Sequence, residues 1–184
     1  MTFVQHYKAH TVAARVLGTV LDGMRSGYAT IDSNAGIFKV EHDWTHDALD
    51  SIVGEYTLPH FSKSLARLKR GSAITIYDLK DESWAENEAH HYRGIGTAAV
   101  IQAPVIYQCQ LMGIMFVHNA SLRRGTDSEV SFCKAVADRT YAALAKLRAE
   151  QDERVINEEL SYRLKNTLAV VQAIALQTIR SSTD

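Results

Sequence analysis

From Thr126 to Asp184 the chain reads TDSEVSFCKAVADRTYAALAKLRAEQDERVINEELSYRLKNTLAVVQAIALQTIRSSTD, with no glycine and no proline. These two residues destabilise the interior of a helix more than any others, so their absence favours one long helix. Nine of the ten glycines lie before residue 114, and the last is Gly125. The chain therefore divides into a mixed region up to about residue 125 and a helical region beyond it.

The beginning of the helical region is marked by a capping box, Thr126-Asp127-Ser128-Glu129. The Thr126 hydroxyl can accept a hydrogen bond from the amide of Glu129, whose carboxylate can reach back to Thr126. Apolar residues then recur at intervals of about three and four, with one irregular step between Val155 and Leu160. The stripe consists of Val130, Ala137, Tyr141, Leu144, Leu147, Gln151, Val155, Leu160, Leu164, Leu168, Val171, Ala175 and Thr178.

A helix over these 50-odd residues would be about 80 Å long at ~1.5 Å per residue. No single small domain can cover such an element, so we expect its distal half to pair with the same helix of a second chain, giving a homodimer. The alternative is a kinked or two-piece helix that folds back on the domain.

The region before Gly125 predicts helices, strands and turns. Helices are expected at His6–Met24 and Phe61–Arg70, the second with a cap glycine at Gly71. Strands are expected at Tyr28–Asp32, Ile37–Trp44, Ala73–Tyr77, Thr97–Val105 and Cys109–His118. The first two flank a turn at 33–36 and form a hairpin, and the last two form a second hairpin in the middle of the sheet. The segment that holds Trp84, His90, His91 and Tyr92 is expected to be irregular.

The composition bounds the functional class. Twenty basic and 21 acidic residues leave a formal net charge of −1, which gives no electrostatic reason to expect nucleic acid or an anionic membrane as a partner. The longest apolar stretches are too short to span a bilayer, and the N-terminus lacks the pattern of a signal peptide. The two cysteines form neither a disulfide framework nor a zinc pattern. We therefore expect a cytoplasmic protein.

Residues 159–175 read ELSYRLKNTLAVVQAIA. This stretch resembles the dimerisation and phospho-acceptor helix of the HWE histidine kinases, whose pattern is Glu-Leu-x-His-Arg-x-Lys-Asn-x-Leu-Ala followed by a Val-Gln-Ala-Ile-Ala-like stretch. Arg163, Lys165 and Asn166 match the pattern, but Tyr162 stands where the family has its phosphorylated histidine.

Position 162 lies about 200° around the helix axis from the apolar stripe, so its side chain is expected to face solvent. A neutral imidazole there can attack a γ-phosphate through a ring nitrogen, whereas a phenol stays protonated at pH 7 and is a poor nucleophile. We therefore expect no phosphohistidine at Tyr162.

The resemblance implies ATP- and Mg-dependent autophosphorylation in a full-length relative, followed by transfer to an aspartate of a response regulator. This chain has no Gly-rich nucleotide loop, and the ATP-binding domain of the family would follow Asp184. No cofactor is expected within the chain itself.

Residues 10–150 resemble a GAF domain. The cues are Asp43-Trp44, Val53-Gly54, the strand after Gly71, Ala103-Pro104-Val105, Gly113–His118 and Ala137–Thr140. The resemblance implies an α+β fold, an antiparallel sheet flanked by helices with the N- and C-terminal helices on one face. It divides the chain into a sensory domain at 1–150 and a dimerisation helix at 151–184.

GAF domains bind small molecules in a pocket between the sheet and its covering loops. The sequence does not indicate which ligand this domain would bind. The candidate lining residues are Trp44, Tyr77, Trp84, His90, His91 and Tyr92. The alternative is that these are core or surface residues of an irregular connection. The pair His90-His91 lacks further ligands at metal-site spacing, so no metal is expected. Covalent bilin attachment would need a suitable cysteine, but Cys109 falls in an expected strand and Cys133 in the long helix.

These features predict the sensory and dimerisation region of a two-component sensor histidine kinase, which relays a signal through a long helix to a phospho-acceptor site that is inactive at Tyr162. The alternative is a non-catalytic GAF module for ligand binding or dimerisation.

Overall fold

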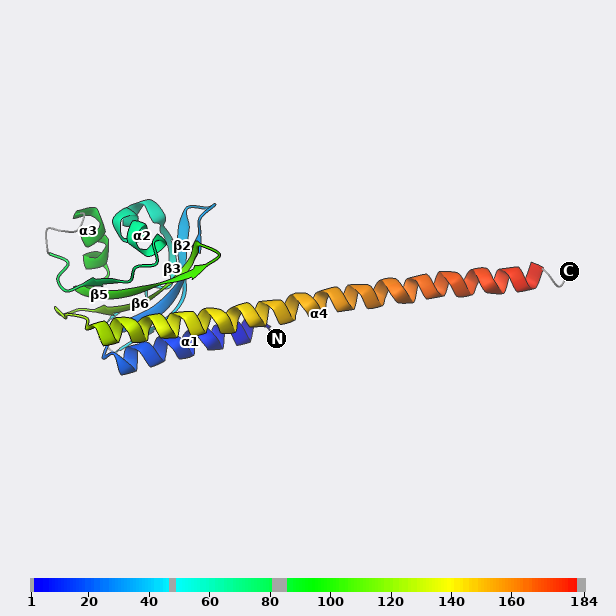
Figure 1. Cartoon of the computed structure of the whole chain (residues 1–184), viewed down its shortest axis with the longest axis horizontal. Coiled ribbons are helices and arrows are strands. Elements are labelled where there is room, and N and C mark those ends of the chain that lie inside the picture. Colours follow the sequence, from blue (N-terminus) through cyan, green and yellow to red (C-terminus); the bar gives the residue numbers. More distant parts are fainter. Residues whose placement is uncertain (1, 47–48, 81–85, 182–184) are drawn as a thin grey trace. The chain divides into compact units, whose positions relative to one another are not determined.

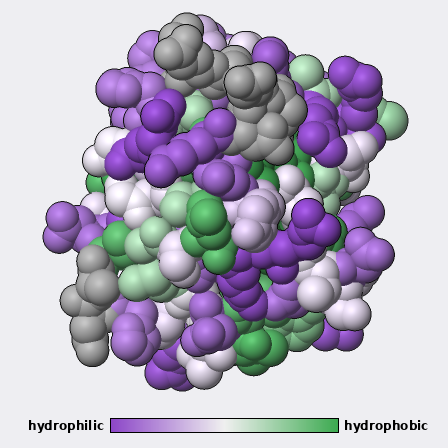
Figure 2. All heavy atoms as spheres, turned by 90° about the vertical axis from the view of Figure 1, so that its left-hand side faces the viewer, coloured by the Kyte–Doolittle hydropathy of each residue, from purple (hydrophilic) through white to green (hydrophobic). Residues whose placement is uncertain are grey.

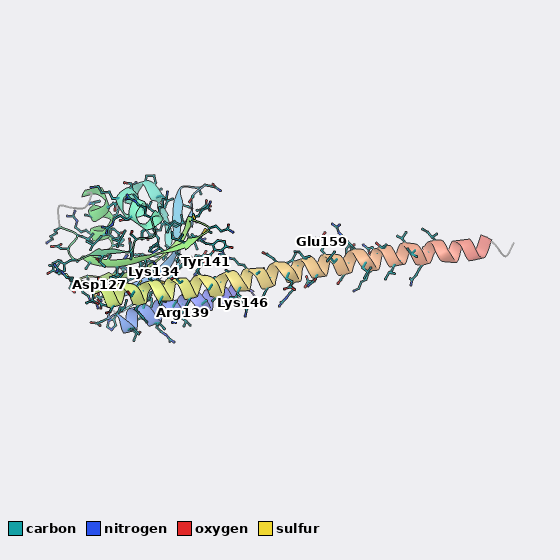
Figure 3. The ribbon with its side chains drawn as sticks, in the orientation of Figure 1. Asp127, Lys134, Arg139, Tyr141, Lys146 and Glu159 are labelled. Carbon is teal, nitrogen blue, oxygen red and sulfur yellow. The ribbon has the colours of Figure 1, made fainter. Side chains whose placement is uncertain are left out.

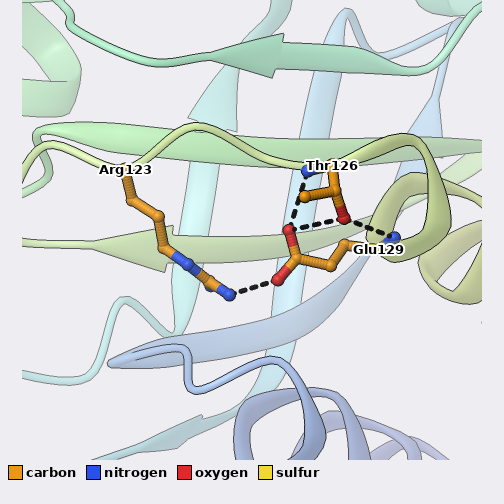
Figure 4. Close-up of polar contacts among 3 residues, drawn as sticks. All are labelled: Arg123, Thr126 and Glu129. Atoms are coloured by element: carbon orange, nitrogen blue, oxygen red, sulfur yellow. Dashed lines mark hydrogen bonds and ion pairs between the residues drawn. The ribbon is translucent and has the colours of Figure 1, made fainter.

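Helix α4 (Asp127–Ser181) begins where the capping box predicts. The Thr126 amide donates a hydrogen bond to Glu129 Oε2 over 2.8 Å, and the Glu129 amide donates to Thr126 Oγ1 over 3.3 Å (Figure 4). Arg123 forms an ion pair with the same carboxylate. The backbone hydrogen bond from Thr126, followed by the charge of Arg123, lowers the pKa of Glu129 against the opposing effect of burial.

The computed structural model describes residues 2–46, 49–80 and 86–181, which divide into two units (Figure 1). The first unit contains Phe3–Leu144 and includes the first part of α4. The second unit contains Ala145–Asp184 and includes the rest of that helix, up to Ser181. Within the described ranges, no helix combines the length and the apolar character that a membrane span requires.

The first unit is built on a six-stranded antiparallel sheet with the order β3-β2-β1-β6-β5-β4. The strands are β1 (Arg25–Asp32), β2 (Ile37–Thr45), β3 (Gly54–Thr57), β4 (Ile74–Ile76), β5 (Ala99–Tyr107) and β6 (Gln110–Asn119). The helices are α1 (Thr2–Val20), the 3-10 helix η1 (Leu58–Phe61), α2 (Ser62–Lys69) and α3 (Glu86–Gly94). This architecture confirms the expected α+β class.

Both predicted hairpins are confirmed, β1–β2 and β5–β6. The second hairpin turns through Gln108 and Cys109, whose φ values of 47° and 60° place both residues in the left-handed region. Two such residues in a two-residue loop match the twist of the flanking strands. The prediction that Cys109 lies in a strand is therefore wrong, because the turn falls one residue later than the pattern suggested.

Helix α1 and the first part of α4 cover one face of the sheet (Figure 1), as predicted. Their contacts centre on Leu17 of α1, Met115 and Val117 of β6, and Cys133 of α4. The approach of α1 is close: a Cβ at Gly18 would come within 2.0 Å of the Trp44 ring.

Helices α2 and α3 lie over the opposite face of the sheet (Figure 1). The prediction of an irregular segment around His90, His91 and Tyr92 is wrong, because these residues belong to α3. The sequence of this short helix, ENEAHHYRG, has a weak apolar pattern. Its position depends on Ala89 and Tyr92, which are buried about one turn apart, and on Glu88, whose carboxylate accepts a hydrogen bond from Ser64 of α2. Trp84 lies outside the described residues.

One face of the first unit is mixed in character. Figure 2 shows one face on which apolar side chains form small separate groups among hydrophilic ones. That face therefore gives no sign of a large apolar docking area.

Candidate functional site

A cavity of about 110 Å³ lies between the sheet and helices α2 and α3. Ten of its sixteen lining residues are apolar, among them Leu68 of α2 and Phe116 of β6. The remaining six are Tyr56, Ser64, His91, Tyr92, Gln102 and His118. A mostly apolar cavity with a few placed polar groups is typical of small-molecule sites.

Strand alternation places the polar residues of the sheet on the cavity side. Gln102 of β5 and His118 of β6 face the cavity, whereas Ala103 and Val117 next to them belong to the core beneath α1 and α4. The same two strands therefore separate the cavity from the terminal helices.

Gln102 and Tyr92 form a buried pair in the cavity wall. The Gln102 Nε2 group donates a hydrogen bond to the Tyr92 hydroxyl over 2.7 Å. Burial raises the pKa of Tyr92 well above its ordinary value, so the phenol is neutral. Among the atoms the structure describes, Gln102 Oε1 is buried and has no hydrogen-bond partner.

His118 is the second buried polar group of the sheet. Burial, together with the charge of Arg25, lowers the pKa of His118 to about 3, so the ring is neutral at pH 7. Thr97 Oγ1 lies 3.4 Å from Nδ1 of the ring. Within the described part of the chain, Nε2 is buried and has no hydrogen-bond partner.

Arg25 lies beside His118 on the neighbouring strand but is absent from the cavity lining. Its side chain is fully buried, and both terminal nitrogens donate to the carbonyl oxygen of Ile95 over 3.1 Å. Burial lowers the pKa of Arg25, and the charge of Asp43 opposes that effect. Arg25 therefore holds the backbone of Ile95, which lines the cavity, in place.

The structure brings together two of the predicted pocket residues. His91 and Tyr92 line the cavity. Trp44 packs near Gly18 on the opposite face, and Tyr77 is exposed, with the Arg124 guanidinium 5.6 Å from its ring centre.

His90 is exposed and lies outside the lining, and the described ranges do not include Trp84. His91, the chain neighbour of His90, stacks on His60 with 4.4 Å between ring centres. Desolvation lowers the pKa of His91, and the nearby His60 and His90 add to this effect.

Sequence patterns did not indicate Gln102 or His118. Each occupies an inward position of a strand, where an apolar residue is expected, and this exception is the only signal the sequence offers.

The residues that line the cavity include no cysteine. Cys109 is exposed in its turn, and Cys133 is buried on the α1 side, where burial raises its pKa to about 12. In the part of the chain that the structure describes, no group of three or more His, Cys, Asp or Glu side chains could hold a metal ion.

The predicted phospho-acceptor residues all lie on α4. Tyr162, Lys165 and Asn166 are exposed, and Arg163 forms an ion pair with Glu159, with 2.6 Å between Nη2 and Oε1. Every residue from 148 to 174 is exposed (Figure 3), including Leu160 at 58% and Leu164 at 62%. The apolar stripe of this unit is therefore uncovered in the single chain.

The irregular step in the predicted stripe has a simple explanation. Ile156 lies four residues before Leu160 and so shares its side of the helix, whereas Val155 lies on the far side. The stripe of the second unit is therefore Ile156, Leu160, Leu164, Leu168 and Val171, which we call the α4 stripe.

Comparison with known proteins gives two family matches. Residues 9–144 match the GAF domain family, and residues 159–184 match the HWE histidine kinase family. A stretch of 37 residues is 49% identical to the blue-light-activated histidine kinase of Brucella anthropi, covering 20% of this chain and 8% of that protein. The chain thus spans only a small part of that relative.

Solved GAF domains share the fold. The blue-light absorbing form of the Thermosynechococcus elongatus PixJ GAF domain aligns with a TM-score of 0.72 at 16% identity, over 85% of this chain and 94% of that chain. The phycocyanobilin-bound GAF domain of a cyanobacterial phytochrome aligns with a TM-score of 0.66 at 17% identity, over 75% and 82%. By its match over residues 9–144 the chain belongs to the GAF domain family, and its GAF domain is followed by an HWE histidine kinase segment at residues 159–184.

Proposed function

We propose that this chain is the sensory and dimerisation region of a two-component sensor histidine kinase, working in the cytoplasm. The observation that carries the proposal is the presence, in one chain, of a GAF domain with an internal cavity and of an HWE segment on helix α4. A full-length relative that has the histidine at the position of Tyr162 would use ATP and Mg and would pass the phosphoryl group to a response regulator.

The strands β5 and β6 offer a direct route for the signal. Gln102 and Phe116 face the cavity, while Met115 and Val117 pack in the core that contains Cys133 of α4. A ligand that favours one arrangement of these strands would shift the packing under α4, because close-packed side chains transmit small displacements.

The α4 stripe would pair with the same stripe of a second chain. The stripe residues are spaced by four, four, four and three, which keeps them on one side of the helix, and a symmetric dimer would cover both copies of that stripe. Such a dimer would remove from water the apolar side chains that are exposed in the single chain.

The cavity volume argues against a bilin in this domain. A cavity of roughly 150 Å³ holds one benzene ring, whereas a tetrapyrrole has four rings, so it would fit only if the segments that cover the 110 Å³ cavity opened. Cys109 and Cys133, which could attach one, lie outside the lining.

Tyr162 specifically favours the second candidate, a GAF module that binds ligand or dimerises but transfers no phosphate. The rest of the HWE pattern surrounds a side chain that cannot take the role of the histidine at neutral pH.

Phosphorylation in trans separates the two candidates. The wild-type chain and Tyr162→His would each be incubated with radiolabelled ATP, Mg and the ATP-binding domain of an HWE histidine kinase. We expect acid-labile label on Tyr162→His and none on the wild type, because only the imidazole forms a phosphoramidate. No label on Tyr162→His would contradict the kinase assignment and favour the second candidate.

A further inference from the structure

The size of the cavity limits the ligand to about one ring. An engineered cavity of roughly 150 Å³, lined by apolar side chains, binds benzene. The cavity here measures about 110 Å³, which is smaller than that example, so it can hold at most about one six-membered ring without widening. Its walls include Leu65 and Leu68 on one side and Ile114 and Phe116 on the other, which are surfaces suited to a flat apolar body.

The cavity also calls for one polar group on the ligand. Gln102 is 7% exposed and His118 is 3% exposed, both line the cavity, and each carries a buried polar atom that no described protein atom satisfies. A buried polar atom without a partner costs about 1–3 kcal/mol. The two residues are diagonal neighbours on β5 and β6, since Gln102 pairs with Phe116 and Val100 pairs with His118, so one end of the cavity is polar.

A charged ligand has no counterpart in the lining. His91 and His118 are neutral because desolvation lowers both pKa values, and burial raises the pKa of Tyr56 and Tyr92 so that both phenols stay neutral. Arg25, the nearby cation, already donates to the Ile95 carbonyl. Burying a charge against neutral walls is strongly unfavourable.

We infer that the cavity takes an uncharged, single-ring ligand that carries a hydroxyl group, with the hydroxyl on the Gln102 amide and the ring against Leu68 and Phe116. A hydroxyl both donates and accepts, so it suits the free amide atom and the neutral ring nitrogen of His118. This inference rests on the proposed sensory role of the domain and names the class of its ligand.

Phenol and toluene have equal numbers of non-hydrogen atoms and test the inference directly. Each would be titrated to about 4 mM, below the solubility of toluene in water, into the full chain, with amide chemical shifts as the readout. We expect phenol to bind about five- to tenfold more tightly than toluene, because one net hydrogen bond contributes about 1 kcal/mol. Gln102→Leu should remove the preference and leave toluene affinity within about threefold, whereas Gln110→Leu, an exposed position on β6, should keep it.

Three results would overturn the inference: no saturable phenol binding, equal affinity for phenol and toluene in the wild type, or competition between biliverdin and phenol for one site. The wild-type comparison stands even if Gln102→Leu does not fold. Phosphorylation of Tyr162→His and the oligomeric state do not depend on these ligands. A failed phenol titration therefore leaves the kinase assignment standing, and a failed phosphorylation leaves the ligand result standing.

Discussion

Glu88 should be the most sensitive single side chain on the cavity side of the fold. Helix α2 begins after Phe61, which has no side chain that can cap a helix. Glu88 of α3 takes that role from outside: its carboxylate accepts hydrogen bonds from the Lys63 amide over 2.5 Å and from the Ser64 hydroxyl over 2.6 Å. The residue is 1% exposed, so water cannot replace it without a rearrangement of the two helices.

Glu88→Ala is expected to lower the free energy of unfolding of the first unit by about 3 kcal/mol. Hydrogen bonds to a charged group contribute about 1.5–3 kcal/mol each, and their loss would leave buried donors of α2 without an acceptor. Glu88→Gln keeps the shape and one acceptor oxygen, so about half of that loss is expected.

Urea denaturation followed by near-ultraviolet circular dichroism measures the change. Glu55→Ala is the matched control, because Glu55 is 61% exposed and its nitrogen–oxygen distance to Lys39 is 3.9 Å; its expected cost is below about 0.5 kcal/mol. Equal costs for Glu88→Ala and Glu55→Ala would refute the capping role.

Three further predictions concern the stability of the first unit. Gly18→Ala should cost at least about 1–3 kcal/mol in the same urea assay, because the new Cβ would overlap the Trp44 ring; an unchanged midpoint would show that α1 packs less closely. Thr126→Ala should cost about 1 kcal/mol by removing the cap of α4. In the wild type, the stability that the lowered pKa of Glu129 provides should be lost as pH falls below about 4.5, and the variant should show less of this loss. A pH profile of the variant identical to that of the wild type would contradict this. His118 has a pKa of about 3 in the folded chain, below its ordinary value of 6.5, so the unfolded state takes up the proton first and stability should fall as pH drops from 6.5 towards 3, by up to ~1.4 kcal/mol per pH unit. His118→Leu should flatten that part of the profile, and an equally steep profile in the variant would assign the slope to other groups.

Local signals in the sequence were sufficient for most of the framework. The capping box at Thr126, the turn at 33–36 and the β-rich runs at 97–105 and 109–118 can be recognised over a few residues, so the pattern alone predicts the elements they bound. The four-residue strand β3 was missed because its alternation is too short to distinguish from a loop.

The candidate site was harder to predict because it is assembled from distant segments. His91 and Tyr92 were found as aromatic and polar residues near one another in sequence. Gln102 and His118 acquire their meaning only when β5 and β6 pair and α2 and α3 cover them. Alternation gives the side on which each residue lies but not which polar atoms remain without a partner.

The oligomeric state of the intact chain tests most directly the claim that α4 is a paired signalling helix. Sedimentation equilibrium at tens of micromolar should give twice the chain mass of 20.5 kDa. Leu164→Lys, on the α4 stripe, should give the mass of one chain, whereas Ala169→Lys, which adds the same charge on the opposite side of the helix, should remain a dimer. A wild-type chain that sediments as a monomer, or a Leu164→Lys chain that stays dimeric, would contradict the account.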